Sequence, residues 1–354
     1  NKASKFINGS LTSDRQYALI STLEELEKAE KLLLQQSILA VDIETNTLDP
    51  FQVDARINTI AFGYDAKKAI CIPLNHSESV NIEFKEKAME VVLKVMSGDA
   101  RKIFHNATFD MKFMKKFGIR TKNFYADTMV MAFLLDVNRN SHGLKQLSAE
   151  FLDGYVYSFT EDLKKLSLYN CEDADNTIQL FYIFFKELKK FPKLLNLFTE
   201  VLIPMIEVIV DMELVGIGID VEYAKELTKK YNRKLEVIAE QIVEEVPEAK
   251  GVLLSSPTQL GKLLFDILKY PKSKKTPTGR YAVDGEVLEG LVRSGCNIAK
   301  YLLLDHKYRK LLNTYVEKIP ETVKSDGRLH GEFRICKGEE GGARTGRLCV
   351  AKGT

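Results

Sequence analysis

The sequence predicts an α/β domain with a mixed sheet, followed by a mainly helical domain. Three short apolar runs rich in β-branched residues occur at residues 37–43, 57–64 and 69–73, which is typical of buried strands. Helical spacing of apolar residues alternates with these runs, as in α/β proteins. From about residue 196 the pattern changes to long helices with one apolar stripe each.

The length and composition indicate two domains. The chain has 354 residues, which exceeds the usual size of one domain, and 45% of them are hydrophobic, enough for two cores. We place the first domain at residues 1–195 and the second at residues 196–348. The 51 basic and 49 acidic residues nearly balance, so the net charge neither requires nor excludes a nucleic-acid partner.

Two features bear on the compartment. The five cysteines form no Cys-x-x-Cys pair, which argues against a zinc knuckle and a secreted disulfide framework and favours a reducing cytoplasm. The most apolar stretch, residues 201–219, contains Glu207, Asp211 and Glu213, and a membrane span would not carry three unpartnered carboxylates. We therefore expect a cytoplasmic protein without a membrane partner.

In the first domain the second and third strands are predicted to form a hairpin around the polar turn at residues 65–68. The remaining predicted elements are a helix at 84–96, a strand at 101–104, and helices at 109–117 and 126–135.

The second domain carries clear helix boundaries. Asp220 is a predicted N-cap, and Pro247 ends the helix that follows it. Ser256 with Gln259 predicts a capping box for the next helix. A third long helix is predicted at residues 298–318.

A set of carboxylates marks the candidate site. Asp42 and Glu44 lie two apart at the end of a strand, so both side chains point to the same face. Asp110 lies near a helix start, and Tyr169 and Asp173 are four apart, on one side of a helix. Hard oxygen ligands without His or Cys suit Mg²⁺ or Mn²⁺ rather than zinc.

Taken alone, an Asp-x-Glu at a strand end is most often a solvated loop entry, and a Tyr-x-x-x-Asp on a helix is usually a surface hydrogen bond. The order in which these motifs follow one another along the chain is informative. The chain contains D-x-E-T, then H-N-x-x-x-D, then Y-x-x-x-D-A-D. In this order the motifs resemble the 3′→5′ proofreading exonuclease of family A (DNA polymerase I-type) DNA polymerases, in the DEDD class with a tyrosine in the third motif. The resemblance implies a ribonuclease H-like fold for the first domain.

The resemblance also implies a role for each motif residue. Asp42 would bridge two divalent metal ions, and Glu44 and Asp173 would hold the ion that binds the attacking water. Asp110 would help to hold the second ion, and Tyr169 would orient the water. A pair of ions can generate the nucleophile and stabilise the leaving 3′ oxygen without a separate general base.

Three further residues are implied in substrate binding by the first domain. Thr45, Leu48 and Asn106 would line the cleft that grips the 3′ nucleotide of single-stranded DNA. The implied reaction is metal-dependent removal of nucleotides from a DNA 3′ end, as part of a polymerase used in replication or repair.

The second domain resembles the thumb and the start of the palm of the same polymerase family. The resemblance covers the stretches VLIPMIEVIVDMELVGIGID, LSSPTQLGKLLF and KTPTGRY, and it ends with ARTGRL. In the family this last element reaches the primer-template duplex, which implies DNA contacts for Arg344, Thr345 and Arg347. The basic linker at residues 269–282 also suits phosphate contacts.

The sequence departs from the family after Leu348. A family member continues with Ser-Ser and later with the aspartates that bind metal for nucleotide addition, whereas this chain continues CVAKGT. We expect no polymerase activity from this chain alone and expect nucleotide addition to need a remaining polymerase segment as partner.

Residues 349–354 resemble the start of an intein, with Cys349 as a nucleophile before two small or apolar residues and a Gly-Thr pair. The alternative is that Cys349 and Val350 replace Ser-Ser before an arbitrary truncation.

Two other functions stay open. One is a nucleic-acid-binding module with a decayed exonuclease, which the presence of all four carboxylates and Tyr169 disfavours. The other is a stand-alone RNA-trimming exonuclease, which the thumb-like second half disfavours. The resemblance places the protein in a bacterial or phage-infected cell.

Overall fold

The computed structural model describes residues 15–78, 81–271, 275–276, 279–336 and 342–351. The chain forms two compact units, each described by itself below. The first unit runs to Gly216 and takes up the chain again from His330, and the second unit is Ile217–Leu329. The two units therefore meet at residues 216–217 and 329–330, whereas the sequence predicted domain limits at residues 195 and 348.

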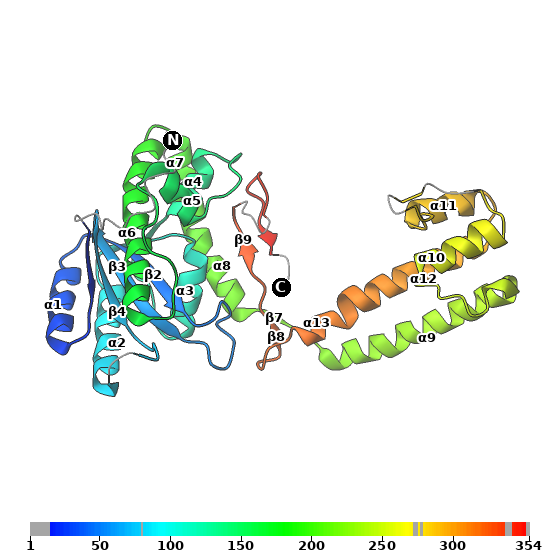
Figure 1. Cartoon of the computed structure of the whole chain (residues 1–354), viewed down its shortest axis with the longest axis horizontal. Coiled ribbons are helices and arrows are strands. Elements are labelled where there is room, and N and C mark those ends of the chain that lie inside the picture. Colours follow the sequence, from blue (N-terminus) through cyan, green and yellow to red (C-terminus); the bar gives the residue numbers. More distant parts are fainter. Residues whose placement is uncertain (1–14, 79–80, 272–274, 277–278, 337–341, 352–354) are drawn as a thin grey trace. The chain divides into compact units, whose positions relative to one another are not determined.

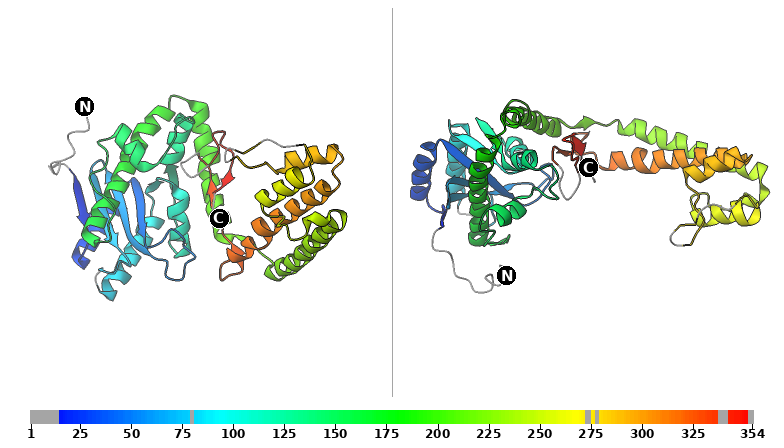
Figure 2. Two further views of the ribbon diagram at one scale, coloured as in Figure 1. Left: turned by 45° about the vertical axis from the view of Figure 1, so that its right-hand side comes forward. Right: turned by 90° about the horizontal axis from the view of Figure 1, so that it is seen from above.

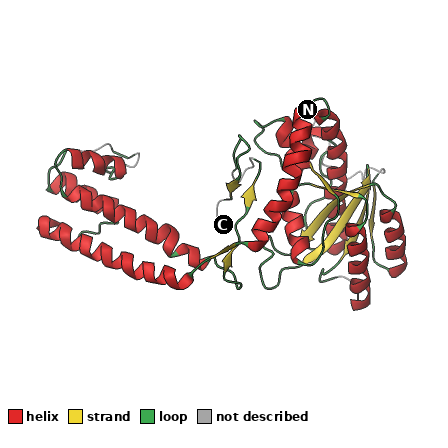
Figure 3. Ribbon diagram, turned by 180° about the vertical axis from the view of Figure 1, so that it is seen from behind, coloured by secondary structure: helices red, strands yellow, loops and turns green. Residues whose placement is uncertain are grey.

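The first unit is built on a six-stranded mixed sheet with the order β1-β4-β3-β2-β5-β6 (Figures 1 and 3). β3 pairs antiparallel with β2 and β4, and the remaining pairs are parallel. The mixed sheet and the β3–β4 hairpin confirm the prediction. The strands are β1 (Gln16–Leu19), β2 (Ile38–Thr45), β3 (Ile57–Asp65), β4 (Lys68–Pro73), β5 (Arg101–Phe104) and β6 (Phe124–Asp127).

Eight α-helices and a short π-helix, Phe198–Leu202, lie in the described part of this unit. The segment predicted as a helix at 126–135 begins as strand β6, whose last residue, Asp127, caps the helix that follows. β1 and the first helix were not predicted. The helices are α1 (Leu23–Leu34), α2 (Ile82–Ser97), α3 (Ala107–Lys116), α4 (Thr128–Leu135), α5 (Leu144–Phe151), α6 (Leu163–Leu188), α7 (Pro192–Leu197) and α8 (Ile203–Val215).

The long helix α6 packs directly on the sheet, as Figure 2 shows. Small side chains permit this close approach: Ala61 of β3 and Ala174 of α6 belong to one small buried cluster. At Gly63 a Cβ atom would lie only 2.6 Å from the carbonyl oxygen of Ala174, so only glycine fits there. Alternate residues such as Ile60 and Phe62 point to the other face and join the main core.

The C-terminal segment of the first unit packs on helices α3 and α8. The His330 ring stacks on Phe51 with centroids 3.6 Å apart, and its Nδ1 bonds to the Glu213 carbonyl oxygen at 2.7 Å. The Glu213 carboxylate accepts a hydrogen bond from the Phe333 N–H at 2.6 Å and pairs with the buried Lys112 ammonium at 2.9 Å. Two short strands, β9 (Phe333–Arg334) and β10 (Cys349–Val350), pair antiparallel in this segment.

The second unit is mainly helical. α9 and α12 pack side by side (Figure 3). The rings of Tyr231 and Tyr308 lie 5.5 Å apart between them. The final helical turns after α12 include a π-helical stretch, Leu312–Val316. The elements are β7 (Ile217–Gly218), α9 (Val221–Glu245), α10 (Pro257–Gly261), α11 (Gly285–Arg293), α12 (Ile298–Leu311), α13 (Lys318–Glu321) and β8 (Arg328–Leu329).

The predicted caps of the second unit are present with one correction. Asp220 caps α9, accepting from the Tyr223 N–H at 2.8 Å, and Ser256 accepts from the Gln259 N–H. The reciprocal half of the capping box was wrong, because the Gln259 side chain accepts from the Leu253 N–H instead. Residues 272–274 and 277–278 of the basic linker lie outside the described residues.

Among the described helices, none has both the length and the apolar run that crossing a membrane requires. The carboxylate of Glu213 on the apolar helix α8 is 2% exposed and has its partner in Lys112.

Candidate metal centre

Three of the predicted carboxylates meet where β2 passes beneath α6. Asp42 and Glu44 lie on the same face of β2, as the strand period predicts, and Asp173 comes from α6. One oxygen from each of the three lies within 4.8 Å of the others. The close packing of α6 on the sheet at Gly63 brings Asp173 to this point.

The fourth carboxylate, Asp110, reaches the same strand from α3. Its Oδ1 accepts a hydrogen bond from the Ile43 N–H at 3.2 Å, at the residue between the two β2 carboxylates. Asn106, the N-cap residue before α3, has a left-handed backbone with φ 63°. The Asp127 carboxylate fixes this start by accepting from the N–H groups of Asn106 and Ala107 at 3.2 and 2.8 Å.

The pKa values of the four carboxylates are all raised. Burial is the largest cause for each. Repulsion within the set adds to it for Asp42, Glu44 and Asp110, and repulsion from Glu172 adds to it for Asp173. The pKa of Glu44 is raised to about 8 and that of Asp173 to about 7. The pKa values of Asp42 and Asp110 are raised well above their usual range. A divalent cation would relieve this repulsion, and an all-carboxylate donor set fits Mg²⁺ or Mn²⁺.

Asn170 holds Asp42 in place. Its Nδ2 donates to Asp42 Oδ2 at 2.6 Å, and its Oδ1 accepts from the Thr59 hydroxyl at 2.9 Å. Both Asn170 and Thr59 are fully buried, so the amide has a fixed orientation. The Asp42 carboxylate is therefore oriented by a neighbour rather than by packing alone.

Two tyrosines lie beside Asp173. The Tyr155 hydroxyl donates to Asp173 Oδ1, and the Tyr169 phenol lies close enough to this carboxylate to lower its pKa. Their ring centroids are 6.1 Å apart. Burial, together with the nearby carboxylates, raises the pKa of both phenols, so both keep their protons as hydrogen-bond donors.

Glu172 fixes the segment that carries Tyr155. Its fully buried carboxylate accepts from the N–H groups of Val156 and Tyr157, each at 2.9 Å, and pairs with Arg15. Adjacent residues of α6 therefore have different tasks, because Glu172 holds the loop while Asp173 faces the metal centre.

The other predicted substrate residues of the first domain lie near the ends of β2 and β5. Thr45 is the last residue of β2, and its hydroxyl donates to the Thr47 carbonyl oxygen at 2.6 Å. Leu48 is 76% exposed and available to a ligand. Asn106 accepts from the Thr108 hydroxyl at 3.3 Å at the start of α3.

The predicted DNA contacts near the C-terminus are all exposed. Arg344, Thr345 and Arg347 surround a turn at Gly346, whose φ is 73° and whose N–H bonds to the Ala343 carbonyl oxygen. The structure does not bring these three side chains into the carboxylate cluster. Cys349 lies in β10, and residues 352–354 of the intein hypothesis lie outside the described residues, so that hypothesis stays a prediction.

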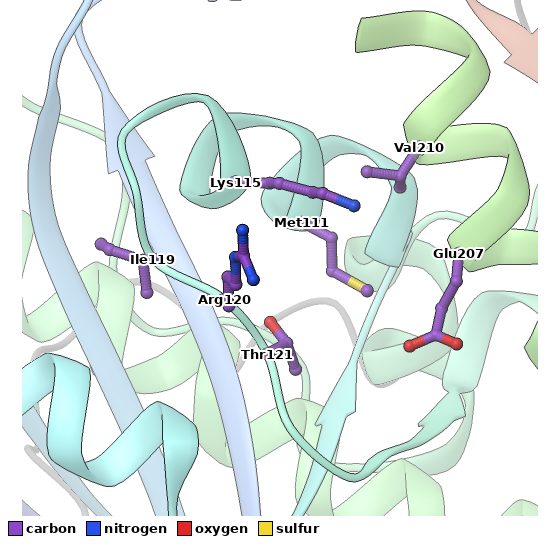
Figure 4. Close-up of a pocket in the computed structure, with 7 residues that line it drawn as sticks. All are labelled: Met111, Lys115, Ile119, Arg120, Thr121, Glu207 and Val210. Atoms are coloured by element: carbon purple, nitrogen blue, oxygen red, sulfur yellow. The ribbon is translucent and has the colours of Figure 1, made fainter.

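A separate pocket of about 300 Å³ lies between α3, the loop after it and α8. Figure 4 shows Met111, Lys115 and Arg120 on one side and Glu207 and Val210 of α8 on the other. Among the described residues that line it, none belongs to the four carboxylates. We assign it no part in the candidate chemistry.

Sequence reasoning did not identify four residues around the centre. Asn170 stands inside the quoted third motif, and Asp127 has the residue type of an N-cap, so both carried a local signal. Tyr155 and Lys145 carried none, because their proximity to Asp173 depends on how the loop and α5 fold onto α6.

Comparison with known proteins agrees with this architecture. Residues 17–189 match the family model described as 3′-5′ exonuclease, and residues 221–352 match that described as DNA polymerase family A. The chain belongs to the family A DNA polymerases. It therefore contains a 3′-5′ exonuclease domain with a ribonuclease H-like sheet and part of a polymerase domain, as the motifs predicted.

Relatives are found in bacteria and in a phage. DNA polymerase I of Borreliella burgdorferi is 30% identical over 344 residues, which cover 92% of this chain and 36% of the relative. DNA polymerase of Escherichia phage T5 is 28% identical, over 90% of this chain and 41% of the relative. The chain thus spans little more than a third of the length of the curated relatives it matches.

A solved structure of the polymerase domain of Pol1 from M. smegmatis, in complex with DNA primer-template and dNTP, has the same fold. The TM-score is 0.74 at 24% identity, over 95% of this chain and 54% of that chain.

Proposed function

We propose that the chain is a 3′→5′ DNA exonuclease that removes nucleotides from DNA ends with two divalent ions, Mg²⁺ or Mn²⁺. The observation that carries the proposal is the meeting of Asp42, Glu44 and Asp173 within 4.8 Å. Asp110 completes the set through its bond to the intervening Ile43 N–H. The match to a 3′-5′ exonuclease family supports the same chemistry.

In this proposal Asp42 contributes to both ion sites. Glu44 and Asp173 would hold one ion and Asp110 would help to hold the other. The ions, when bound, supply activation of the attacking water and stabilisation of the leaving oxygen. Asn170 keeps the Asp42 carboxylate turned toward the cluster.

The reaction is hydrolysis of the last phosphodiester of the strand. Water oxygen forms a bond to phosphorus, the bond from phosphorus to the preceding 3′ oxygen breaks, and that oxygen takes up a proton. The products are a nucleoside 5′-monophosphate and a strand shortened by one residue. Tyr169 stays protonated because its pKa is raised, so it would orient the water and would not remove its proton.

DNA is the proposed partner. Thr45, Leu48 and Asn106 would contact the 3′ nucleotide of a single strand, and Arg344, Thr345 and Arg347 would contact a primer-template duplex. The exposure of Leu48 and of the C-terminal turn supports both assignments. We place the activity in the cytoplasm of a bacterial or phage-infected cell, and we propose a remaining polymerase segment as a further partner.

The test is degradation of single-stranded DNA by the 354-residue chain. With a 5′ label we expect a ladder of products shortened one nucleotide at a time from the 3′ end, in Mg²⁺ or Mn²⁺ but not in EDTA. Asp42→Ala and Asp173→Ala should each abolish the ladder. Asp99→Ala is the control, because Asp99 is exposed and pairs only with Lys122 among the ion pairs of the described residues.

Four results would contradict the proposal. Degradation that survives in EDTA would remove the metal assignment, and full activity in either carboxylate variant would remove the site. Faster trimming of RNA than of DNA of the same sequence would favour the RNA-trimming alternative. Tight DNA binding without cleavage would favour the binding module with a decayed exonuclease.

A further inference from the structure

A lysine outside the sequence motifs lies at the edge of the carboxylate cluster. Lys145 belongs to the first turn of α5, which packs on α6. Its Nζ lies 5.2 Å from the centroid of the Tyr169 ring and 5.8 Å from that of the Tyr155 ring. The Tyr155 hydroxyl donates to Asp173 and the Tyr169 ring lies 6.1 Å from the Tyr155 ring, so the ammonium stands over the same side of the cluster.

The charge of Lys145 acts on the cluster without being bound to it. It lowers the pKa of both Glu44 and Asp173, against the larger effect of burial. The side chain is exposed, and no ion pair between described residues includes it. The ammonium is therefore close enough to interact electrostatically with this side of the site and keeps its three donors available.

Bound ions and DNA would change what this ammonium faces. Two divalent cations would neutralise the carboxylates, and the substrate would bring phosphate groups to the same place. A lysine on a flexible four-carbon stem binds phosphate as a point charge. Because Lys145 stands on the side of Glu44 and Asp173, the phosphate nearest to it would be the one that the water attacks.

We propose that the Lys145 ammonium binds a non-bridging oxygen of the scissile phosphodiester at the DNA 3′ end. This inference rests on the proposed exonuclease function. Lys145 would then touch the substrate directly and stabilise the negative charge on the phosphate during attack. The competing explanation is that the cation only packs on the Tyr169 ring and keeps it in position.

The experiment compares Lys145→Gln and Lys145→Arg with a matched control, Lys189→Gln. Lys189 also places its ammonium on an aromatic ring, 4.5 Å from the Phe185 centroid, and it is exposed. It follows Asp173 by sixteen residues along α6, roughly 24 Å at the rise of an α-helix. The control thus repeats the cation–aromatic contact far from the cluster.

Two readouts separate a phosphate contact from packing. The first is exonuclease kcat/KM in Mg²⁺. The second is binding of a single-stranded oligonucleotide by fluorescence anisotropy in EDTA, over a range of salt concentrations. Each oligonucleotide is prepared with a normal 3′-terminal linkage and with an uncharged methylphosphonate at that linkage.

We expect Lys145→Gln to lower kcat/KM roughly tenfold or more, as loss of a charged hydrogen bond does. We expect Lys145→Gln to bind the oligonucleotide more weakly. The slope of log binding constant against log salt concentration, the salt slope, should become shallower by about 0.7, the value for one phosphate contact with a single strand. The methylphosphonate should remove the difference in binding between Lys145→Gln and wild type. Lys145→Arg should recover part of the loss, and Lys189→Gln should match wild type.

The inference is overturned if Lys145→Gln keeps wild-type kcat/KM. It is also overturned if kcat falls while the binding constant and salt slope do not change, since that result indicates a tyrosine-positioning role. If wild type shows no metal-dependent cleavage, the proposed function itself fails, and this inference with it.

Discussion

Glu44→Gln tests whether the carboxylate cluster is strained when no cation is bound. The pKa of Glu44 is raised from 4.5 to about 8, with burial the largest cause and repulsion from Asp173 next. The folded protein therefore holds a proton that the unfolded chain releases at lower pH. Because the unfolded state binds fewer protons between about pH 5 and pH 8, the free energy of unfolding must fall as the pH rises through this window.

The magnitude follows from the same two pKa values. At about 1.4 kcal/mol per pKa unit, full ionisation of Glu44 would cost the folded state up to about 5 kcal/mol. Glu44 is partly exposed, and solvent screening reduces this figure, so we expect about 2 kcal/mol. A neutral glutamine cannot ionise. As the pH rises through this window, the free energy of unfolding of Glu44→Gln should therefore fall by about 2 kcal/mol less than that of wild type.

The measurement is urea denaturation followed by circular dichroism at pH 5.5 and pH 9 in EDTA, for wild type, Glu44→Gln and the exposed control Glu27→Gln. Mg²⁺ at pH 9 should restore stability to wild type and to Glu27→Gln, but much less to Glu44→Gln, because metal replaces the released protons. If all three proteins lost the same free energy between the two pH values, the account of a repulsive, cation-seeking cluster would be refuted.

Three further outcomes are expected. Tyr169→Phe should lower kcat of cleavage by less than Asp173→Ala does, because it removes one orienting hydrogen bond and no proposed metal ligand; equal losses would give Tyr169 a different role. Gly63→Ala should destabilise the first unit by about 1–3 kcal/mol and weaken Mg²⁺ binding, because the new Cβ would clash with the Ala174 carbonyl oxygen. An unchanged melting temperature in calorimetry would disprove the tight packing of α6. Asp127→Ala should lower the free energy of unfolding by about 1–2 kcal/mol in urea denaturation, because the side chain caps the starts of two helices. Asp127→Asn should be closer to wild type. An equal loss of stability in Asp127→Asn would mean that the charge of Asp127 matters more than its hydrogen bonds.

The carboxylate cluster was largely predictable because its parts are encoded locally. Asp42 and Glu44 share a face through the strand period, and Tyr169 and Asp173 share one through the helix period. Asp110 stood next to a recognisable helix start. That these separate pieces meet depends on the sheet order, which the family resemblance implied and the local patterns alone did not.

Part of what surrounds the cluster was not predictable, for a physical reason. Tyr155 and Lys145 reach Asp173 through tertiary folding, and neither follows a period that includes it. β1 is an edge strand of only four residues, Gln16–Leu19, and its side chains alternate only between exposed and partly buried. So short a segment has no clear alternation of apolar and polar residues by which to predict a strand. The C-terminal segment joins the first unit through Glu213 and Lys112, a buried ion pair whose residues lie in separate helices.

Acidic residues of α6 also tie this helix to the chain around β1. Glu172 and Asp175 flank Asp173, and both are anchored to the chain around β1: Arg15 pairs with the fully buried Glu172, and the Tyr17 hydroxyl donates to Asp175 at 2.6 Å. The sequence similarity to exonucleases starts at residue 17, two positions after this arginine. A protein trimmed to the aligned region would keep every proposed metal ligand but leave Glu172 buried without its cation, a loss of about 3–5 kcal/mol for pairs of this kind. Compensation of the buried Glu172 charge therefore depends on a residue outside the region matched to the exonuclease family.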